Sequence, residues 1–192
     1  MISSPETDEQ LLGRLARGDS QALTALYDRH ARAIFAFLCR LTGDAAAAEN
    51  LLQDTFLAAW QGAATFRRRS SVRTWLFGIA HHKAGHWLRR HRPLPLEERD
   101  DLPDPSPAVP ELADAAWERE RVTAALAQLP HEQRTVLELT FYHGLSCAET
   151  AEVMDCPVGT VKSRAYLARK RLARLLADLA EPTGRREKSD ER

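Results

Sequence analysis

The sequence lacks the features of membrane, secreted and metal-binding proteins. None of its apolar runs approaches the roughly 20 residues that a bilayer span needs, and its first ten residues are polar and acidic, unlike a signal peptide. Its three cysteines, Cys39, Cys147 and Cys156, are an odd number without CxxC spacing, which argues against a disulfide framework and a zinc site. We therefore expect a cytoplasmic protein with no membrane insertion, no metal, and buried or half-buried thiols.

The chain as a whole has no net charge, but its charges are unevenly distributed along the sequence. The 27 basic and 27 acidic residues cancel, yet residues 1–92 carry a net +5, residues 93–120 a net −7 and residues 121–192 a net +2. No acidic residue lies between Asp54 and Glu97, and that stretch holds eight basic residues; the stretch 157–177 also has no acids and holds six basic residues. Such stretches are either solvated surface or binding sites for a polyanion.

Strand signals are missing as well, since β-branched alternation is confined to short fragments. Six of the ten prolines fall within 93–110, where they exclude regular structure. Amphipathic patterns predict helices over 8–17, 20–40, 45–61, 73–91, 112–129, 131–143, 147–154 and 158–179. The sequence therefore predicts an all-α protein with two small helical domains, 8–92 and 113–180, joined by a flexible, proline-rich acidic linker over 93–112 and followed by a disordered tail over 181–192.

The second domain contains a candidate helix-turn-helix. Ser146 and Glu149 have the spacing of a capping box, and a turn over 155–159 leads into the helix 158–179. One face of that helix is apolar, and all six of its basic residues lie on the other. The pattern is typical of a recognition helix that enters a major groove, although an ordinary helical hairpin with a basic outer face has the same pattern.

Two helices of the first domain carry unusual surfaces. The helix 45–61 has a polar face that includes Leu57, which is either part of a protein interface or an ordinary exposed leucine. On the helix 73–91, Trp75 shares a stripe with histidines and arginines beside a basic loop. Rings and cations together suit single-stranded DNA, whereas Trp75 and Trp87 are otherwise core residues.

Two sets of motifs resemble a known family. The segments 48–60 and 75–80, with Arg89 and Arg90, resemble region 2 of bacterial RNA polymerase sigma factors of the extracytoplasmic-function (ECF) group. The segments 126–130, 144–152 and 157–164, with Arg134, resemble region 4 of the same group. The resemblance implies a subunit that is not an enzyme and needs no cofactor. Such a subunit binds core RNA polymerase, directs it to promoters, helps to open the duplex and is controlled by an anti-sigma factor.

The resemblance also implies roles for individual residues. The positions that match the contact with the β′ clamp of core polymerase are Asn50, Gln53 and Asp54, with Leu57 on the same face. The positions that match the minus-ten contact are Phe66, Arg67, Arg68, Arg69, Ser70, Arg73, Trp75, His82, His86, Arg89 and Arg90. The positions that match or adjoin the minus-thirty-five contact are Thr160, Lys162, Ser163, Arg164 and Arg169. The linker matches the segment that threads toward the active-site and RNA-exit channels, and the β flap is the expected partner of region 4.

Several residues depart from the family pattern. Asn50 stands where the family usually has Asp, and His82 and His86 stand where Asn and Asp are common, which leaves the minus-ten preference open. Asp155 replaces a frequent turn glycine, and it tolerates positive φ better than most residues. Thr150 replaces an aliphatic residue, which weakens the packing of its helix.

Other classes of protein remain as alternatives. A conventional two-domain DNA-binding regulator would need a dimerisation heptad or a ligand-binding domain, and the sequence has no clear sign of either. An enzyme or metal site could use His81, His82 and His86, but no carboxylates accompany them in a ligand-like pattern. Cys147 and Cys156 flank the same short helix and could form a redox switch, but no lysine or arginine adjoins either in sequence.

Overall fold

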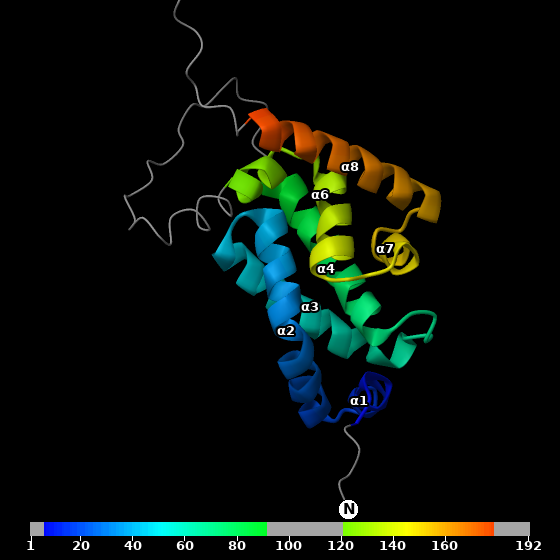
Figure 1. Ribbon diagram of the computed structural model, residues 1–192. Helices are drawn as coiled ribbons and strands as arrows, with labels where there is room; N and C mark the ends of the chain where they lie inside the picture. The colour runs from blue at the N-terminus through cyan, green and yellow to red at the C-terminus, as the bar shows by residue number, and fades with distance from the viewer. Residues whose placement is uncertain (1–5, 92–120, 179–192) are drawn as a thin grey trace, which may run out of the picture.

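The computed structural model describes residues 6–91 and 121–178, and within these ranges every regular element is a helix (Figure 1). The predicted all-α class is confirmed for this part of the chain. The predicted linker 93–112 and tail 181–192 lie outside the described residues, as do residue 92 and residues 113–120.

The first domain contains four α-helices. These are α1 (Asp8–Leu15), α2 (Ser20–Thr42), α3 (Ala45–Gly62) and α4 (Val72–His91), with a 3₁₀ turn η1 (Ala63–Thr65) after α3. The long helix α2 packs against α1, α3 and α4. Phe37 and Leu38 of α2 and Leu76 and Phe77 of α4 are almost completely buried, and the rings of Phe37 and Phe77 meet edge to face at 5.4 Å. The apolar stripes therefore form one helical core.

Local capping residues set the helix boundaries of the first domain. Asp19 caps α2 by accepting a hydrogen bond from the Gln21 amide, and Asp44 caps α3 by accepting one from the Ala47 amide. Gly43 ends α2 at a φ of +70°, a left-handed conformation that glycine adopts without strain. The predicted separation of the helices 8–17, 20–40 and 45–61 is thus confirmed, with α2 two residues longer than expected.

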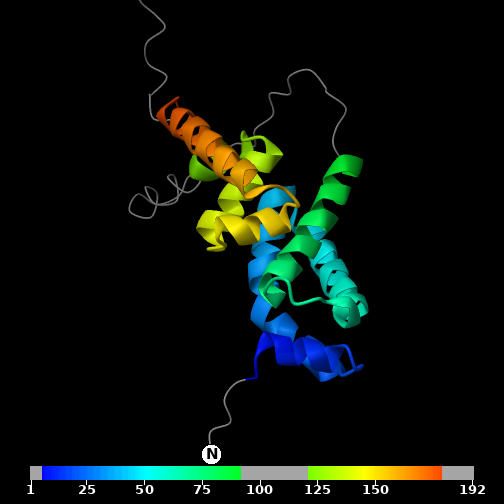
Figure 2. The same ribbon diagram turned by 90° about the vertical axis from the view of Figure 1, so that its right-hand side faces the viewer.

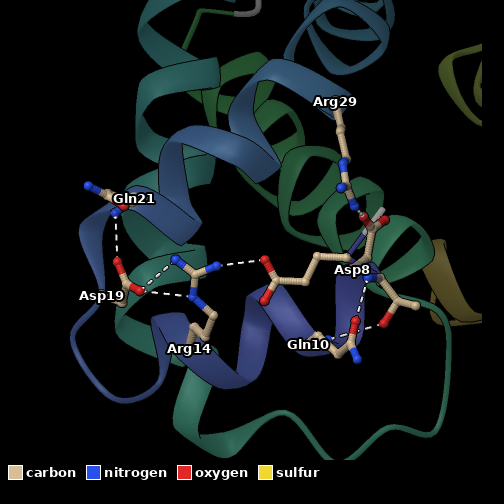
Figure 3. Close-up of polar contacts among 8 residues, drawn as sticks. Asp8, Gln10, Arg14, Asp19, Gln21 and Arg29 are labelled. Atoms are coloured by element: carbon tan, nitrogen blue, oxygen red, sulfur yellow. Dashed lines mark hydrogen bonds and ion pairs between the residues drawn. The ribbon is translucent and has the colours of Figure 1, made fainter. Parts of the chain in front are cut away.

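Polar contacts hold α1 against α2 (Figure 3). Arg14 pairs with Glu6 at 2.6 Å and with Asp19 at 2.7 Å, which joins the helix to the turn before α2. Asp8 pairs with Arg29 at 2.8 Å on the other side of α1. Burial alone would raise the pKa of Asp8, but hydrogen bonds and charges from α2, first among them Arg29, lower it overall.

The second domain begins in the described residues with a helical segment over 121–127, followed by α6 (His131–Leu137). The helix predicted over 131–143 is interrupted, because its second half, Glu138–Tyr142, is a π-helix, η2. Short helix α7 (Cys147–Val153) and long helix α8 (Val158–Asp178) complete the domain.

The predicted helix-turn-helix is present. Ser146 and Glu149 form the capping box of α7, with each side chain bonded to the other residue's amide. Asp155 adopts a φ of +47° in the turn between α7 and α8. Thr150 is fully buried and its hydroxyl has no hydrogen-bond partner, so α7 carries the cost of an unpaired polar group. Of the departures from the family pattern, Asp155 therefore lies at a strained backbone position and Thr150 at an imperfectly satisfied one.

The two domains form one body. A continuous core of buried residues includes Phe77 and Ala80 of α4 together with Leu139, Leu145 and Val153 of the second domain. Helix α7 packs against α4, and α6 and η2 contact α2. Figure 2 shows α7 crossing beside α4, while α8 lies at the end of the molecule opposite α1 (Figures 1 and 2).

Candidate nucleic-acid and protein interfaces

Helix α3 presents the predicted polar face to solvent. Asn50, Gln53, Asp54 and Leu57 are all exposed, and their spacing places them on one side of the helix. Leu57 is 53% exposed, whereas neighbouring Phe56 is 4% exposed in the core. The structure therefore brings all four candidate polymerase-binding residues together on one accessible surface. We call this set the α3 face.

The basic loop before α4 combines cations with an aromatic pair. Arg67, Arg68 and Arg69 are exposed, and Arg68 has a φ of +52°. Half-buried Phe66 lies against half-buried Trp75, with ring centroids 5.0 Å apart. The Trp75 ring is neither a fully buried core residue nor a free platform.

The C-terminal half of α4 is an exposed surface of histidines and arginines. His82 and His86 pack edge to face at 4.6 Å, and Arg89 and Arg90 follow in the last turn. The Arg89 charge is the largest cause of a lowered pKa at His86, so the imidazole is more readily neutral than usual. Neutral imidazoles beside arginines can contact bases while the arginines contact phosphates.

A groove of about 580 Å³ runs along α4 beside α7. Its lining includes half-buried Ser70 and Trp75, together with His82 from α4 and Val153 and Asp155 from the second domain. Part of the predicted minus-ten surface thus borders the second domain directly.

Helix α8 separates an apolar face from a basic one, as predicted. Val161, Ala165 and Ala168 are buried. Leu172 and Leu175 are partly buried against a smaller apolar cluster of the second domain, which contains Leu126, Leu129, Leu137 and Ala168. The buried positions hold the helix in place, so its opposite face is fixed in orientation toward solvent.

The predicted minus-thirty-five residues lie in the first half of α8. Lys162, Ser163 and Arg169 are exposed, and Thr160 is half-buried. Arg164 is half-buried as well. Its guanidinium pairs with Glu132 of α6 at 2.8 Å and lies 3.8 Å from the Cys156 sulfur. Four of the five residues can therefore reach a ligand directly or with a small rotation, whereas Arg164 must leave Glu132 to do so.

Arg73 is a predicted site residue that is engaged with the other domain. Its guanidinium donates to the backbone oxygen of His143 in the second domain, and neighbouring Thr74 donates to Glu149 at 3.2 Å. On α2, Arg40 bonds both Glu138 and His143. The sequence does not predict these contacts, because each joins positions at least 70 residues apart and no local pattern encodes it.

The three histidines considered for a metal site do not converge. His81 faces His131 of α6, with ring centroids 6.1 Å apart, while His82 and His86 pack together on the exposed side of α4. In the ranges 6–91 and 121–178, no group of three His, Cys, Asp or Glu residues is placed to hold a metal ion, and all three cysteines are free thiols. None of the helices in these ranges is long and apolar enough to cross a membrane.

Comparisons with known proteins agree with both halves of this arrangement. Residues 26–93 match the family profile of sigma-70 region 2, and residues 119–172 match that of sigma-70 region 4. The ECF RNA polymerase sigma factor SigL of Mycobacterium tuberculosis is 35% identical over 167 residues, covering 85% of this chain and 94% of SigL. The chain belongs to the ECF group of RNA polymerase sigma factors.

Further relatives of this sigma factor cover nearly its whole length. The RNA polymerase sigma-H factor of Pseudomonas aeruginosa is 33% identical over 185 residues, covering 91% of this chain and 96% of the relative. The solved structure of CnrH in complex with the cytosolic domain of CnrY has a TM-score of 0.70 at 28% identity, covering 92% of this chain and all of that one. RpoE of Bartonella quintana, solved with the anti-sigma factor NepR, has a TM-score of 0.58 at 27% identity, covering 80% of this chain and 96% of RpoE.

Proposed function

We propose that this ECF sigma factor binds core RNA polymerase through the α3 face and reads promoters with two separate basic surfaces. The loop 66–71 and α4 bind the opened minus-ten element, and the exposed face of α8 enters the major groove of the minus-thirty-five element. The observation that carries this proposal is the coincidence of the family's two regions with two exposed surfaces of the matching chemistry.

The α3 face suits a protein partner more than DNA. It has no basic residue, and its carboxylate, Asp54, lies 4.0 Å from Lys83 of α4 at the edge of the surface. An exposed leucine among polar side chains can supply the apolar centre of an interface with a polar rim. Asn50 in place of a charged residue shifts the polar contact toward Gln53 and Asp54.

The charge distribution predicts weak DNA binding by the isolated protein. Each basic surface is small, and the chain as a whole is neutral. Binding to both promoter elements becomes tight when a polymerase holds the two domains at the correct separation, because the second contact is then effectively intramolecular.

The assignment extends to domain limits, control and location. Residues 8–92 act as the polymerase and minus-ten domain, and residues 113–180 as the minus-thirty-five domain. Two solved relatives are bound to partners, CnrH to the cytosolic domain of CnrY and RpoE to the anti-sigma factor NepR, which supports control of this protein by an anti-sigma factor. The protein catalyses no reaction of its own, and it acts in the cytoplasm with its polymerase.

The test compares promoter binding with and without core RNA polymerase of the same bacterium. Fluorescence anisotropy on a pool of labelled promoter fragments should show weak, salt-sensitive binding by the isolated protein and tight, selective binding after core enzyme is added. Gln53→Ala should weaken the interaction with core enzyme, while Gln21→Ala, at an exposed glutamine of α2 outside the α3 face, should leave it intact. Tight promoter binding by the isolated chain, unchanged by core enzyme, would overturn the proposal.

A further inference from the structure

The contact between the two domains combines close helix packing with a polar cluster. Helices α4 and α7 approach so closely that a Cβ added at Gly78 would lie 4.0 Å from the Val153 Cα (Figure 2). Beside this packing, Arg40 of α2 reaches across the interface. Its Nε donates to Glu138 of η2, and its guanidinium lies over the Tyr142 ring at 4.6 Å.

His143 completes this cluster and can do so only as a neutral ring. Its Nε2 lies 3.1 Å from Nη2 of Arg40. A guanidinium only donates hydrogen bonds, so Nε2 must accept and must carry no proton. The ring is 8% exposed and packs against Phe37 at 5.8 Å and Phe77 at 4.8 Å, which leaves no room for water to solvate a charge.

The charges around His143 oppose its protonation. Arg40 approaches from α2, and Arg73 from α4 bonds the His143 backbone oxygen. Of the carboxylates of the same interface, Glu138 pairs with Arg40 through one oxygen, and Glu149 bonds Thr74 and Ser146. Burial first, and then the two guanidiniums, lower the pKa of His143 to about 4.

We propose that Arg40, Glu138 and His143 form an intramolecular latch that holds the second domain closed over Arg73, and that protonation of His143 releases it. A protonated ring loses its bond with Arg40 and becomes a buried cation beside the charges of two arginines. The second domain then separates from α2 and α4, and Arg73 becomes free for other partners. This consequence for promoter binding rests on the proposed function, whereas the latch itself does not.

Three further titrating groups bear on the pH response. His81 of α4 and His131 of α6 face each other across the interface, and burial lowers the pKa of both, that of His81 to about 4. Their protonation also favours opening. Burial raises the pKa of Glu138 despite Arg40, so its protonation in acid favours the closed form. The contribution of His143 is therefore measured as the difference in pH response between wild type and a variant that lacks the titrating His143 ring.

The experiment measures the distance between the domains in the full chain without polymerase or DNA. Fluorophores introduced at exposed Glu9 of α1 and Lys170 of α8 report the closed and open forms by energy transfer. His143→Gln keeps an acceptor for Arg40 but does not titrate. The opening constant is the ratio of open to closed molecules. We divide its value in wild type by its value in His143→Gln at each pH. Because the ordinary histidine pKa is 6.5, this quotient should rise about tenfold between pH 7.5 and pH 5.5.

The matched control is His91→Gln, an exposed histidine at the end of α4, which should keep the full wild-type response. Circular dichroism at both pH values checks that the helices persist. If His143→Gln does not fold, a titration of the His143 ring by NMR in wild type and Arg40→Met replaces it, and the pKa should rise in the variant. The latch is overturned if wild type and His143→Gln respond equally to pH, if the domains are already apart at pH 7.5, or if His143 titrates near 6.5 in wild type. Failure of promoter binding with an intact pH response would instead refute the proposed function alone.

Discussion

Replacing Arg40 by methionine should destabilise the closed protein in a pH-dependent way. Glu138 is 1% exposed, Arg40 pairs with one of its carboxylate oxygens, and the other oxygen has no partner. Without Arg40, the buried carboxylate can avoid its charge by taking up a proton. Since its ordinary pKa is 4.5, that proton costs about 3 kcal/mol at pH 7 but less than about 1 kcal/mol at pH 5. The penalty is therefore at most about 3 kcal/mol at neutral pH and small in acid.

Urea unfolding followed by circular dichroism, together with the interdomain distance, measures this penalty. It appears as lost unfolding free energy if the domains stay packed, or as a longer distance if they separate. Arg32→Met, an exposed arginine on the same helix, should lose less than about 0.5 kcal/mol. Adding Glu138→Gln to Arg40→Met should restore most of the loss at pH 7. Equal effects of Arg40→Met at pH 5 and pH 7, or no effect on either signal, would refute the reasoning.

Three simpler substitutions test the framework of helices by urea unfolding at pH 7. Ser146→Ala removes the cap of α7 and should cost about 1 kcal/mol, whereas exposed Ser20→Ala should cost little; equal losses would contradict the capping role. Phe77→Ala empties the centre of the core and should cost about 3–5 kcal/mol, while exposed Leu57→Ala should change stability by less than about 0.5 kcal/mol. Gly43→Ala forces a side chain into the left-handed region and should cost about 1 kcal/mol, and no loss would show that the turn rearranges.

The sequence predicts those parts of the molecule that depend on neighbouring residues. Asp19, Gly43 and Ser146 set helix boundaries through contacts within four residues, and these boundaries are confirmed. The α3 face follows from the helical period, because the spacing of Asn50, Gln53, Asp54 and Leu57 puts them on one side only when the segment is helical. The same reasoning separates the buried and basic faces of α8.

The features that the sequence does not predict depend on how the two domains pack. Arg40 and Glu138 are 98 residues apart, and neither has a local partner that marks it as part of an interface. His143 reads as the end of a helix, and only the structure places it between two arginines. The π-helix η2 likewise depends on a small change of hydrogen-bond register that the amphipathic pattern does not record.

Run-off transcription with purified core RNA polymerase tests the central claim most directly, with a pool of promoter fragments as template. The wild-type protein should initiate transcription from a selected subset of fragments. Gln53→Ala should lose transcription together with core binding, and Arg164→Ala should lose transcription while core binding persists. Glu132→Ala, which only frees the Arg164 side chain, should stay active. No transcription by wild type with core enzyme, or unchanged transcription by both Gln53→Ala and Arg164→Ala, would contradict the account.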